Sequence, residues 1–324
     1  MTLVSVMTPC FRSEAYLEGY FDAVLTQSAL DRLEVVLVLN EPSAEEMAIV
    51  ERFREAHPGI VRPIVFPEGW DTKDAESRGA RSQALVSESW NRAVAAARGE
   101  YLAHWDMDDI RTPDSIEAQL RTLVDNPHAL MTYGDMVVVG HYGDRDGELV
   151  VAPEFDRELF MSGCPGGTFR LWRRDAVQVV GPFDEQLKSG ADFDLYVRVT
   201  ANGDMVRTPQ VLGYYLNAGG GLSTAGDDVQ PTERTVIEMR YGILDKVDRR
   251  YLAAASRYRI GELRFGDDWL PVDSFVPDLQ DRLDRAAADP RLLPKPKPGH
   301  RIAGRAKSVA QRVRSALGLG GGRQ

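Results

Sequence analysis

The sequence has few cysteines, no long apolar run and no glycine-rich phosphate loop after its first strand. Two cysteines, Cys10 and Cys164, in 324 residues argue against a disulfide framework and favour a reducing compartment such as the cytoplasm. The longest apolar runs, such as Val35–Leu39, are far too short to cross a bilayer. The first residues predict a strand at Leu3–Met7 rather than a signal peptide. The segment that follows, Thr8–Arg12, lacks the G-x-G-x-x-G pattern, which argues against a dinucleotide-binding dehydrogenase.

Charge is distributed unevenly along the chain. The net charge is −10, yet nine of the 39 Lys and Arg residues and none of the 49 Asp and Glu residues follow Asp289. The preceding part is therefore strongly acidic, which argues against nucleic acid as a partner. Beyond the stiff linker Pro294–Pro298, apolar residues recur at spacings of three and four among basic ones. This pattern predicts an amphipathic helix over 300–317 that lies on an anionic membrane surface, or else a solvated or protein-docked helix.

A strand that ends in clustered aspartates is the most informative segment. The apolar run Tyr101–Trp105 meets three carboxylates, at Asp106, Asp108 and Asp109. Open α/β sheets bind their ligands at the carboxyl ends of the strands. Clustered carboxylates need a cation to neutralise them, and oxygen ligands suit Mg²⁺ or Mn²⁺. The segment therefore predicts metal-assisted handling of a phosphorylated substrate, and the alternative is a solvated acidic turn.

Strand and helix patterns alternate through the first 109 residues, which predicts a mostly parallel sheet covered on both faces. The expected strands are Leu3–Met7, Glu34–Leu39, Val61–Phe66 and Tyr101–Trp105, and the expected helices are Glu14–Gln27, Ser43–His57 and Ser82–Arg98. A further helix is expected after the aspartates, with Thr112 as its N-cap and Pro113 at its first position. The charged segment Glu68–Ala84 is interpreted as a solvated insertion or as a loop over the ligand.

The pattern changes after about residue 125, where turn-rich sequence separates shorter elements. We expect antiparallel strands at Leu130–Gly140 and Glu148–Ala152, a strand at Thr168–Trp172, and helices at Arg174–Val180, Phe193–Ala201, Thr235–Leu270 and Pro277–Ala287. These patterns divide the chain into an α/β domain over 1–235, a helical extension over 236–290, and a basic linker and tail over 291–324. The domain itself divides into a nucleotide-type half, 1–109, and a mixed half, 110–235.

Five segments, in this order, resemble the family 2 glycosyltransferases. They are Val6–Phe11, Leu39–Ser43, Tyr101–Asp109, Gly181–Glu185 and Gly190–Arg198. The resemblance covers roughly residues 3–224, with Val211–Tyr215 and Gly221–Ser223 near its end. It implies the GT-A fold, with a Rossmann-like nucleotide-sugar half fused to an acceptor half.

The resemblance also implies a reaction. A sugar would pass from a nucleoside diphosphate sugar to an acceptor hydroxyl with inversion at the anomeric carbon, in the synthesis of a cell-surface polysaccharide or glycoconjugate. The cation would neutralise the leaving diphosphate. The acceptor would be a saccharide or a lipid-linked molecule, and the latter would give the basic tail a purpose at the inner membrane face.

Roles at the donor site follow from the same resemblance. Asp108 is expected to contact the metal, Asp106 to contact the ribose or a metal-bound water, and Asp109 to be a second metal ligand or to cap the next helix. The residues expected near the nucleoside or the donor are Thr8, Pro9, Cys10, Asn40 and Asn91. The family usually has Asp-Asp where this chain has Asn40-Glu41. Because an asparagine amide both accepts and donates hydrogen bonds, the base is left open among uridine, guanosine, thymidine and cytidine.

Two aspartates begin the late helix. Asp192 matches the family's catalytic carboxylate, a general base that takes the acceptor proton opposite the leaving group. Asp192 and Asp194 are two residues apart, so on a helix they point about 200° apart and cannot share a site. By the family pattern Asp194 is structural, and Arg198 is expected to pair with a nearby carboxylate. The helix dipole favours an ionised Asp192 near neutral pH.

Two other functions remain as alternatives to transfer. A sugar nucleotidyltransferase shares the α/β plan but would want a glycine-rich phosphate loop after the first strand, where Thr8–Arg12 has none. A glycosyltransferase-like binding protein without activity would not need Asp108 and Asp192. The large Trp90 is interpreted as a core residue rather than as a platform for substrate.

Overall fold

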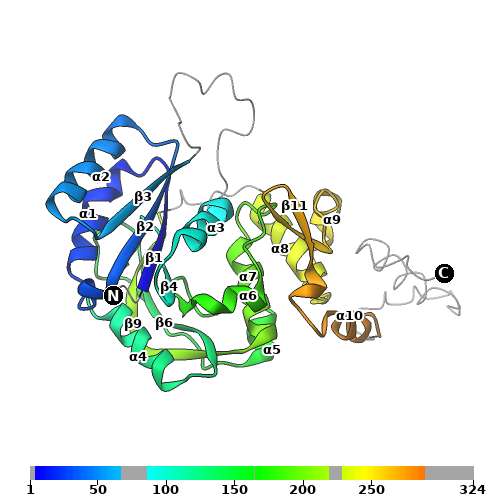
Figure 1. Ribbon diagram of the computed structural model, residues 1–324. Coiled ribbons are helices and arrows are strands. Elements are labelled where there is room, and N and C mark those ends of the chain that lie inside the picture. Colours follow the sequence, from blue (N-terminus) through cyan, green and yellow to red (C-terminus); the bar gives the residue numbers. More distant parts are fainter. Residues whose placement is uncertain (1–3, 67–85, 164, 219–227, 289–324) are drawn as a thin grey trace, which may run out of the picture.

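A curved mixed sheet runs through the molecule (Figure 1). The computed structural model describes residues 4–66, 86–163, 165–218 and 228–288. The segments 68–84, 221–223 and 291–324, for which expectations are stated above, lie outside the described residues. Within these described ranges the sheet has nine strands, in the order β3-β2-β1-β4-β8-β6-β9-β5, and β7 pairs with β6 outside this order. The strands are β1 (Val4–Cys10), β2 (Leu33–Asn40), β3 (Val61–Phe66), β4 (Tyr101–His104), β5 (Ile110–Arg111), β6 (Ala129–Val139), β7 (Glu148–Val150), β8 (Leu171–Arg173) and β9 (Asp204–Leu216).

The first half is the parallel, doubly covered sheet that the sequence predicts. Strand β1 pairs in parallel with β2 and β4, and β2 pairs in parallel with β3. Helices α1 (Glu14–Leu25) and α2 (Ala44–Ala56) lie on one side of these strands and α3 (Val86–Ala96) on the other (Figure 1). Val36 and Val38 of β2 belong to the hydrophobic cluster that contains α3, whereas Val35 and Leu37 belong to the cluster that contains α1. Side chains alternate between the two faces because a strand has a period of two.

The second half joins the same sheet through antiparallel and parallel pairs. Strand β8 lies antiparallel between β4 and β6, and β6 pairs in parallel with the long strand β9. Helices α4 (Ser115–Asp125), α5 (Arg157–Met161), α6 (Val177–Val180) and α7 (Ala191–Asn202) connect and cover these strands. The expected antiparallel pair of β6 and β7 is confirmed. Strand β9 was not predicted, although the segment Val211–Tyr215 within it was singled out.

The expected start of the helix after the aspartates is wrong. Ile110 pairs with Tyr214 of β9, which draws residues 110–111 into the sheet as β5. The Thr112 hydroxyl donates to carbonyl oxygens of β9 instead of capping a helix. The N-cap is Asp114, so Pro113 lies before the helix rather than at its first position.

The C-terminal part is only partly helical and packs on the sheet domain. It contains α8 (Val229–Arg240), α9 (Leu252–Ala255), a hairpin of β10 (Glu262–Phe265) and β11 (Asp268–Pro271), and α10 (Leu279–Ala288). The prediction of a helix through residue 270 is wrong, because Gly266, with φ 61°, lets the chain turn back into the hairpin. Val236 and Ile237 of α8 share a hydrophobic cluster with Leu195 of α7. The domain boundary expected at residue 235 falls inside α8, and this helix packs against α7.

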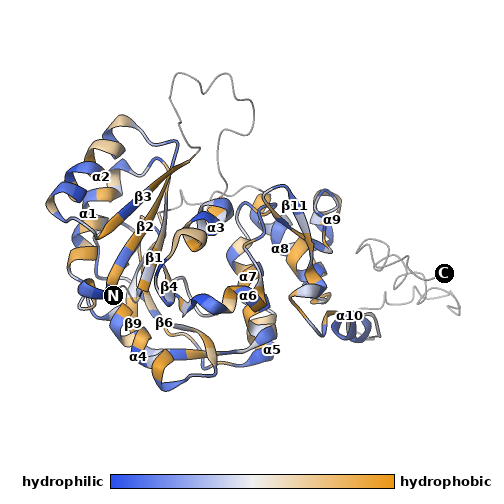
Figure 2. Cartoon of the chain, viewed as in Figure 1, coloured by the Kyte–Doolittle hydropathy of each residue, from blue (hydrophilic) through white to orange (hydrophobic). Residues whose placement is uncertain are grey.

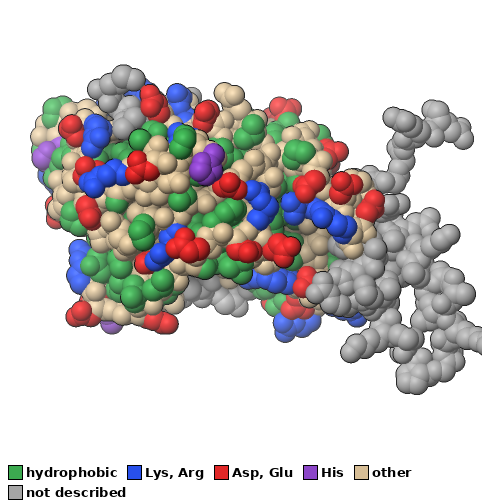
Figure 3. Space-filling view, turned by 90° about the horizontal axis from the view of Figure 1, so that it is seen from below, with side chains coloured by type: hydrophobic (Ala, Val, Ile, Leu, Met, Phe, Trp, Pro, Cys, Tyr) green, Lys and Arg blue, Asp and Glu red, His purple; other side chains and the backbone are tan. Residues whose placement is uncertain are grey.

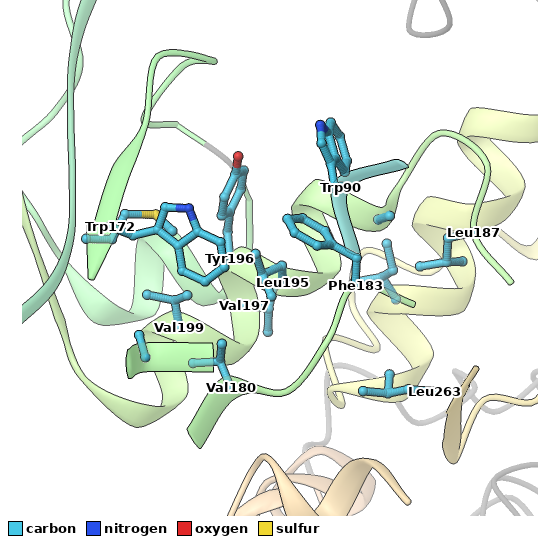
Figure 4. Close-up of a cluster of buried hydrophobic side chains, with 14 of the residues drawn as sticks. Trp90, Trp172, Val180, Phe183, Leu187, Leu195, Tyr196, Val197, Val199 and Leu263 are labelled. Atoms are coloured by element: carbon cyan, nitrogen blue, oxygen red, sulfur yellow. The ribbon is translucent and has the colours of Figure 1, made fainter. Parts of the chain in front are cut away.

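A cluster of aromatic side chains fills the space between the sheet and α7. Trp90, Trp172, Phe183 and Tyr196 converge in it from separate elements (Figure 4). Trp90 is 7% exposed and stacks on His104 at 5.2 Å between ring centroids, which confirms its expected place in the core. Burial lowers the pKa of His104 to about 3, so this ring is neutral at physiological pH.

Hydrophobic residues lie mainly in the central strands, and hydrophilic residues lie mainly on the outer surface. The central strands are largely hydrophobic and the outward sides of α1 and α2 are largely hydrophilic (Figure 2). On the face seen from below, Lys and Arg side chains lie next to Asp and Glu side chains (Figure 3). That face therefore carries mixed charge. None of the helices within the described ranges has the length and apolar character needed to span a bilayer.

Candidate active site

The carboxyl ends of three parallel strands meet at one edge of the sheet. The register places Cys10 of β1 beside Leu39 of β2, and Met7 of β1 beside His104 of β4. The segments that follow these strands must therefore lie close together at this edge, which is where open α/β sheets bind ligands. This edge brings together the candidate residues of the first strand, of the second strand and of the aspartate cluster.

The charges of two carboxylates, Asp108 and Asp192, act on a third, Asp106, at this edge. Burial raises the pKa of Asp106 to about 7, and the charges of Asp108 and Asp192 add to the effect, whereas Thr168 and Arg111 oppose it. Burial also raises the pKa of Asp108. Asp192 comes from α7, so the fold brings a carboxylate that is distant in the sequence to the aspartate cluster. Like charges held close together favour a bound cation.

The side chains at this edge fit a hard divalent cation that takes some of its ligands from the protein and the others from the phosphates of a substrate. Within the described ranges, no group of three or more His, Cys, Asp and Glu side chains is placed to hold a metal by itself. Mg²⁺ characteristically uses one or two carboxylates together with substrate phosphates and water. The half-buried pair Asp106 and Asp108 matches that requirement.

Asp109 is turned toward the protein rather than toward the edge. It is 1% exposed, and its Oδ1 accepts a hydrogen bond of 3.0 Å from Leu216 N of β9. Burial raises its pKa well above the ordinary value. Its expected alternative role as a helix cap is wrong, because Asp114 occupies the N-cap of α4. Asp109 fastens the aspartate segment to β9, and its role as a metal ligand stays a prediction.

A buried arginine, which was missed from the sequence, lies near the aspartate cluster and acts on its charges. Arg111 donates to His104 O at 2.7 Å and to Gln119 Oε1 at 2.8 Å. Burial lowers the pKa of Arg111 to about 10, so it is charged at neutral pH. Its positive charge lowers the pKa of both Asp106 and Asp109. The only signal in the sequence was its place directly after the acidic segment.

Asp192 lies in the first turn of α7 and is half-buried. Its Oδ1 accepts a hydrogen bond of 2.7 Å from Phe193 N. Burial raises the pKa of Asp192, while that hydrogen bond and the charge of Arg170 act in the opposite direction. The helix dipole was the only effect considered from the sequence, and burial acts on the pKa of this carboxylate in the opposite direction. Asp192 is therefore a stronger base than an exposed aspartate.

Asp194 faces the interior, as expected. Asp194 and its two arginine partners are fully buried, and its oxygens accept from Arg198 Nη2 at 2.8 Å, Arg240 Nη1 at 2.6 Å and Tyr241 Oη at 2.7 Å. Arg240 also pairs with Asp184 at 2.8 Å. The structural role of Asp194 and the pairing of Arg198 are confirmed. Arg240 at the end of α8 and Tyr241, which caps this helix, were missed, since no local pattern links them to α7.

Two side chains expected near the nucleoside are directed inward. The hydroxyl groups of Thr8 and Tyr20 are 2.6 Å apart and buried. Cys10 Sγ lies 3.5 Å from Glu46 Oε1, and burial raises the pKa of this thiol. Pro9, between them, is half-buried. A contact of Thr8 or Cys10 with a nucleoside stays a prediction.

Glu46 ties together the loops that follow β1 and β2. Its Oε1 accepts from Ser13 N at 2.7 Å, and its Oε2 accepts from Ser43 N at 2.8 Å. Ser43 Oγ in turn accepts from Glu46 N, which completes a capping box at the start of α2. Sequence reasoning missed this residue, although the S-x-x-E spacing was available to find it.

The turns at this edge have unusual backbone conformations. Arg12 and Glu41, with φ of 52° and 49°, are the only residues besides glycine that have positive φ in the described ranges. Glu41 follows β2 directly, and Arg12 lies two residues after the end of β1. Such conformations cost roughly 1–3 kcal/mol and tend to occur at functional sites. Glu41 Oε1 is buried and accepts no hydrogen bond from the residues that the structure describes, and the neighbouring Asn40 is buried. The pair that replaces the family's Asp-Asp therefore lies at this edge.

Asn91 holds a turn. Its Nδ2 donates to Phe183 O at 2.9 Å and to Glu185 Oε1 at 2.8 Å, while its Oδ1 accepts from Phe183 N at 2.9 Å. These bonds fix residues 183–185, which belong to one of the five segments that resemble the family. The expected contact of Asn91 with the donor stays a prediction.

Solved structures share this fold. Staphylococcus aureus TarS in complex with UDP-GlcNAc aligns with a TM-score of 0.58 at 15% identity, over 98% of this chain and 88% of that chain. The complex of TarS 1-349 with UDP gives 0.55 at 16% identity, over 79% and 69% of the two chains. These similarities confirm the α/β fold of GT-A type that the sequence predicts.

Curated relatives lead to the same family. A chondroitin synthase of Pasteurella multocida is 21% identical over 72% of this chain, but the match spans only 23% of that longer protein. A PGL/p-HBAD biosynthesis glycosyltransferase of Mycobacterium bovis is 24% identical over 74% of this chain and 87% of its own length. The sequence profile described as "Glycosyl transferase family 2" matches residues 5–177, more than half of the chain. The strand ends, the aspartate cluster and the profile thus agree, and the chain belongs to glycosyl transferase family 2.

Proposed function

We propose that the protein is an inverting, metal-dependent glycosyltransferase that moves a sugar from a nucleoside diphosphate sugar to an acceptor hydroxyl. The observation that supports this most directly is the convergence of Asp106, Asp108 and Asp192 at one edge of the sheet. Family membership and the fold agree with it. A sugar nucleotidyltransferase is not favoured, since all the matches described above are to glycosyltransferases or their structures.

The proposed roles concern the leaving diphosphate on one side of the transferred sugar and the acceptor hydroxyl on the other. Asp106 and Asp108 would hold Mn²⁺ or Mg²⁺, which when bound neutralises charge on the leaving diphosphate. Asp192 would take the proton from the acceptor hydroxyl, a role for which its raised pKa makes it better suited. Asp109 and Arg111 would keep the aspartate segment in place through their hydrogen bonds to Leu216 N and His104 O.

The donor and the acceptor are proposed by class. TarS binds UDP and UDP-GlcNAc, which supports a nucleoside diphosphate sugar as donor. Glu41, with its unbonded buried oxygen, and Asn40 would face the base. The relatives' names, chondroitin synthase, hyaluronan synthase and PGL/p-HBAD biosynthesis glycosyltransferase, support a polysaccharide or glycoconjugate acceptor. A cytoplasmic protein with a lipid-linked acceptor and a membrane contact through 300–317 is part of this proposal and rests on the sequence pattern alone.

A binding screen followed by two variants tests the proposal. Nucleoside diphosphates should raise the melting temperature more with Mn²⁺ than without it. Asp108→Asn should abolish both this metal-dependent stabilisation and transfer, because it removes charge with little change of shape. Asp114→Asn, an exposed aspartate at the start of α4, is the matched control and should behave like the wild type. Unchanged metal dependence in Asp108→Asn would refute the metal assignment.

The second variant tests the base. Asp192→Asn should keep the affinity for the nucleoside diphosphate and lose transfer by about 10²-fold or more, the usual range for a general base. Wild-type transfer by this variant would refute the assignment. A wild-type protein that binds donors but neither transfers nor hydrolyses them would instead be a binding protein.

A further inference from the structure

The N-terminus of α7, which carries Asp192, is held by a side chain from a distant helix. Glu233 of α8 is fully buried. Its Oε1 accepts a hydrogen bond from Lys188 N at 2.8 Å, and its Oε2 accepts from Ser189 N at 2.7 Å and from Gly190 N at 2.8 Å. A helix start leaves backbone N–H groups without partners in the helix, and this carboxylate binds the N–H groups of the segment that leads into it.

No side chain of α7 replaces this carboxylate. The N-cap residue is Gly190, which has no side chain to accept a hydrogen bond. The two helices also fit closely here, since a Cβ atom at Gly190 would lie 2.9 Å from Ile237 Cδ1. Tyr258 Oη donates to Glu233 Oε1 at 3.1 Å, so the carboxylate is itself held in place. Hydrogen bonds to a charged acceptor are roughly twice as strong as neutral ones.

We propose that Glu233 is a positioning residue for Asp192, and this inference rests on the proposed role of Asp192 as the base. Asp192 lies two residues after Gly190, so a shift of the backbone at 188–190 moves its carboxylate relative to Asp106 and Asp108. Misplacement by about 1 Å can cost on the order of 10²-fold in rate. The donor edge is built by β1, β2 and β4, whereas the hydrogen bonds of Glu233 go to residues 188–190 and Tyr258.

Glu233→Gln tests the proposal, because an amide offers one acceptor oxygen where the carboxylate offers two. We expect kcat for transfer to fall on the order of tenfold, while the affinity for the nucleoside diphosphate stays unchanged. Glu238→Gln is the matched control. Glu238 is also a buried carboxylate of α8, but it pairs at 2.9 Å with Arg234 of its own helix. Equal kcat in the two variants would overturn the proposal, as would a loss of donor affinity that matches the loss of kcat.

A double variant separates positioning from a merely structural role. In an Asp192→Asn background, Glu233→Gln should cause no further loss of the residual transfer, because it acts through the carboxylate that is already absent. A further tenfold loss would overturn the proposal. If Asp192→Asn alone transferred like the wild type, the proposed function would fail. If Asp192→Asn were impaired and Glu233→Gln were not, only the positioning role would fail.

Tyr258→Phe serves if Glu233→Gln does not fold. It removes one hydrogen bond to the carboxylate and leaves the bonds to residues 188–190 in place. We expect a smaller fall in kcat with unchanged donor affinity. A folded Tyr258→Phe protein with wild-type kcat would overturn the proposal in that case.

Discussion

Asp194→Asn should destabilise the protein far more than its small change of shape suggests. Asp194 and Asp184 balance the charges of Arg198 and Arg240, and all four side chains are buried. The substitution leaves one positive charge without a counter-charge in the interior. Removal of one partner from a buried ion pair costs about 3–5 kcal/mol. That is a large part of a typical unfolding free energy of about 5–15 kcal/mol.

Thermal unfolding provides the assay. A loss of this size should lower the melting temperature by on the order of 10 °C in a protein of this length. Asp192→Asn is the matched control for stability, since it makes the same substitution two residues earlier in α7. The carboxylate of Asp192 accepts a hydrogen bond from Phe193 N and has no ion pair like those of Asp194 in the described part of the chain. Asp192→Asn should therefore melt close to the wild type.

Activity should separate the two variants in the opposite direction. At a temperature where both are folded, Asp194→Asn should retain more transfer than Asp192→Asn, because its carboxylate faces the ion-pair network rather than the aspartate cluster. The reasoning would be refuted if Asp194→Asn melted no lower than Asp192→Asn, since the buried arginines would then not need this counter-charge.

Three further predictions concern pH, packing and the tail. Burial acts to raise the pKa of Asp194, but the charges of Arg198 and Arg240, together with the hydrogen bonds from Tyr241 and Arg198, lower it overall. The stabilisation by this carboxylate is therefore complete above the ordinary aspartate pKa of about 4 and is lost as the pH falls below it. The difference in melting temperature between wild type and Asp194→Asn should be constant from neutrality to about pH 5 and narrow below about pH 4, and a constant difference at lower pH would contradict this linkage. Gly213→Ala should lower the unfolding free energy by about 1–3 kcal/mol, because its methyl group would lie 2.6 Å from Ile110 O. Gly140→Ala is the control in the same denaturation experiment and should be neutral, because the space around Gly140 is open. Truncation after Pro290 should leave transfer to a soluble acceptor intact but weaken binding to anionic vesicles at low salt, and equal vesicle binding by both forms would exclude the membrane contact.

The sequence was sufficient for the parallel half of the fold because its central strands β1, β2 and β4 are buried on both faces, although the edge strand β3 is only half-buried. Such strands appear as uninterrupted apolar runs, and their ends are marked by polar residues. The observed bounds of β2 and β3 agree with the predicted ones to within about a residue. The aspartate cluster could be located for the same reason.

The remaining errors come from contacts that the local sequence does not encode. Strand β5 forms because β9 pairs with it, and β9 is distant in the sequence. The β10–β11 hairpin was the more avoidable error, since Gly266-Asp267 is a turn signal inside the segment taken as helical.

At the site, the sequence predicted which residues lie at the ligand edge better than it predicted the direction of their side chains. Thr8 and Cys10 were both placed at the ligand edge, and both side chains point inward. The period of two along β1 already assigns them to the face of Val4 and Val6, which packs against α1. Arg240 could not be found at all, because its importance depends on two carboxylates that only the folded chain brings to it.

The contribution of α8 to the network around Asp194 has a consequence for the order of folding. A ribosome makes Asp184, Asp194 and Arg198 before it makes Arg240. Until Arg240 has emerged, the nascent chain has two carboxylates and one guanidinium, which together carry one negative charge. Burial of this uncompensated charge is unfavourable. We therefore expect the first 230 residues to remain open around α7 during synthesis, and to close only when α8 supplies the missing charge. The core of the catalytic half would then be completed from its C-terminal side.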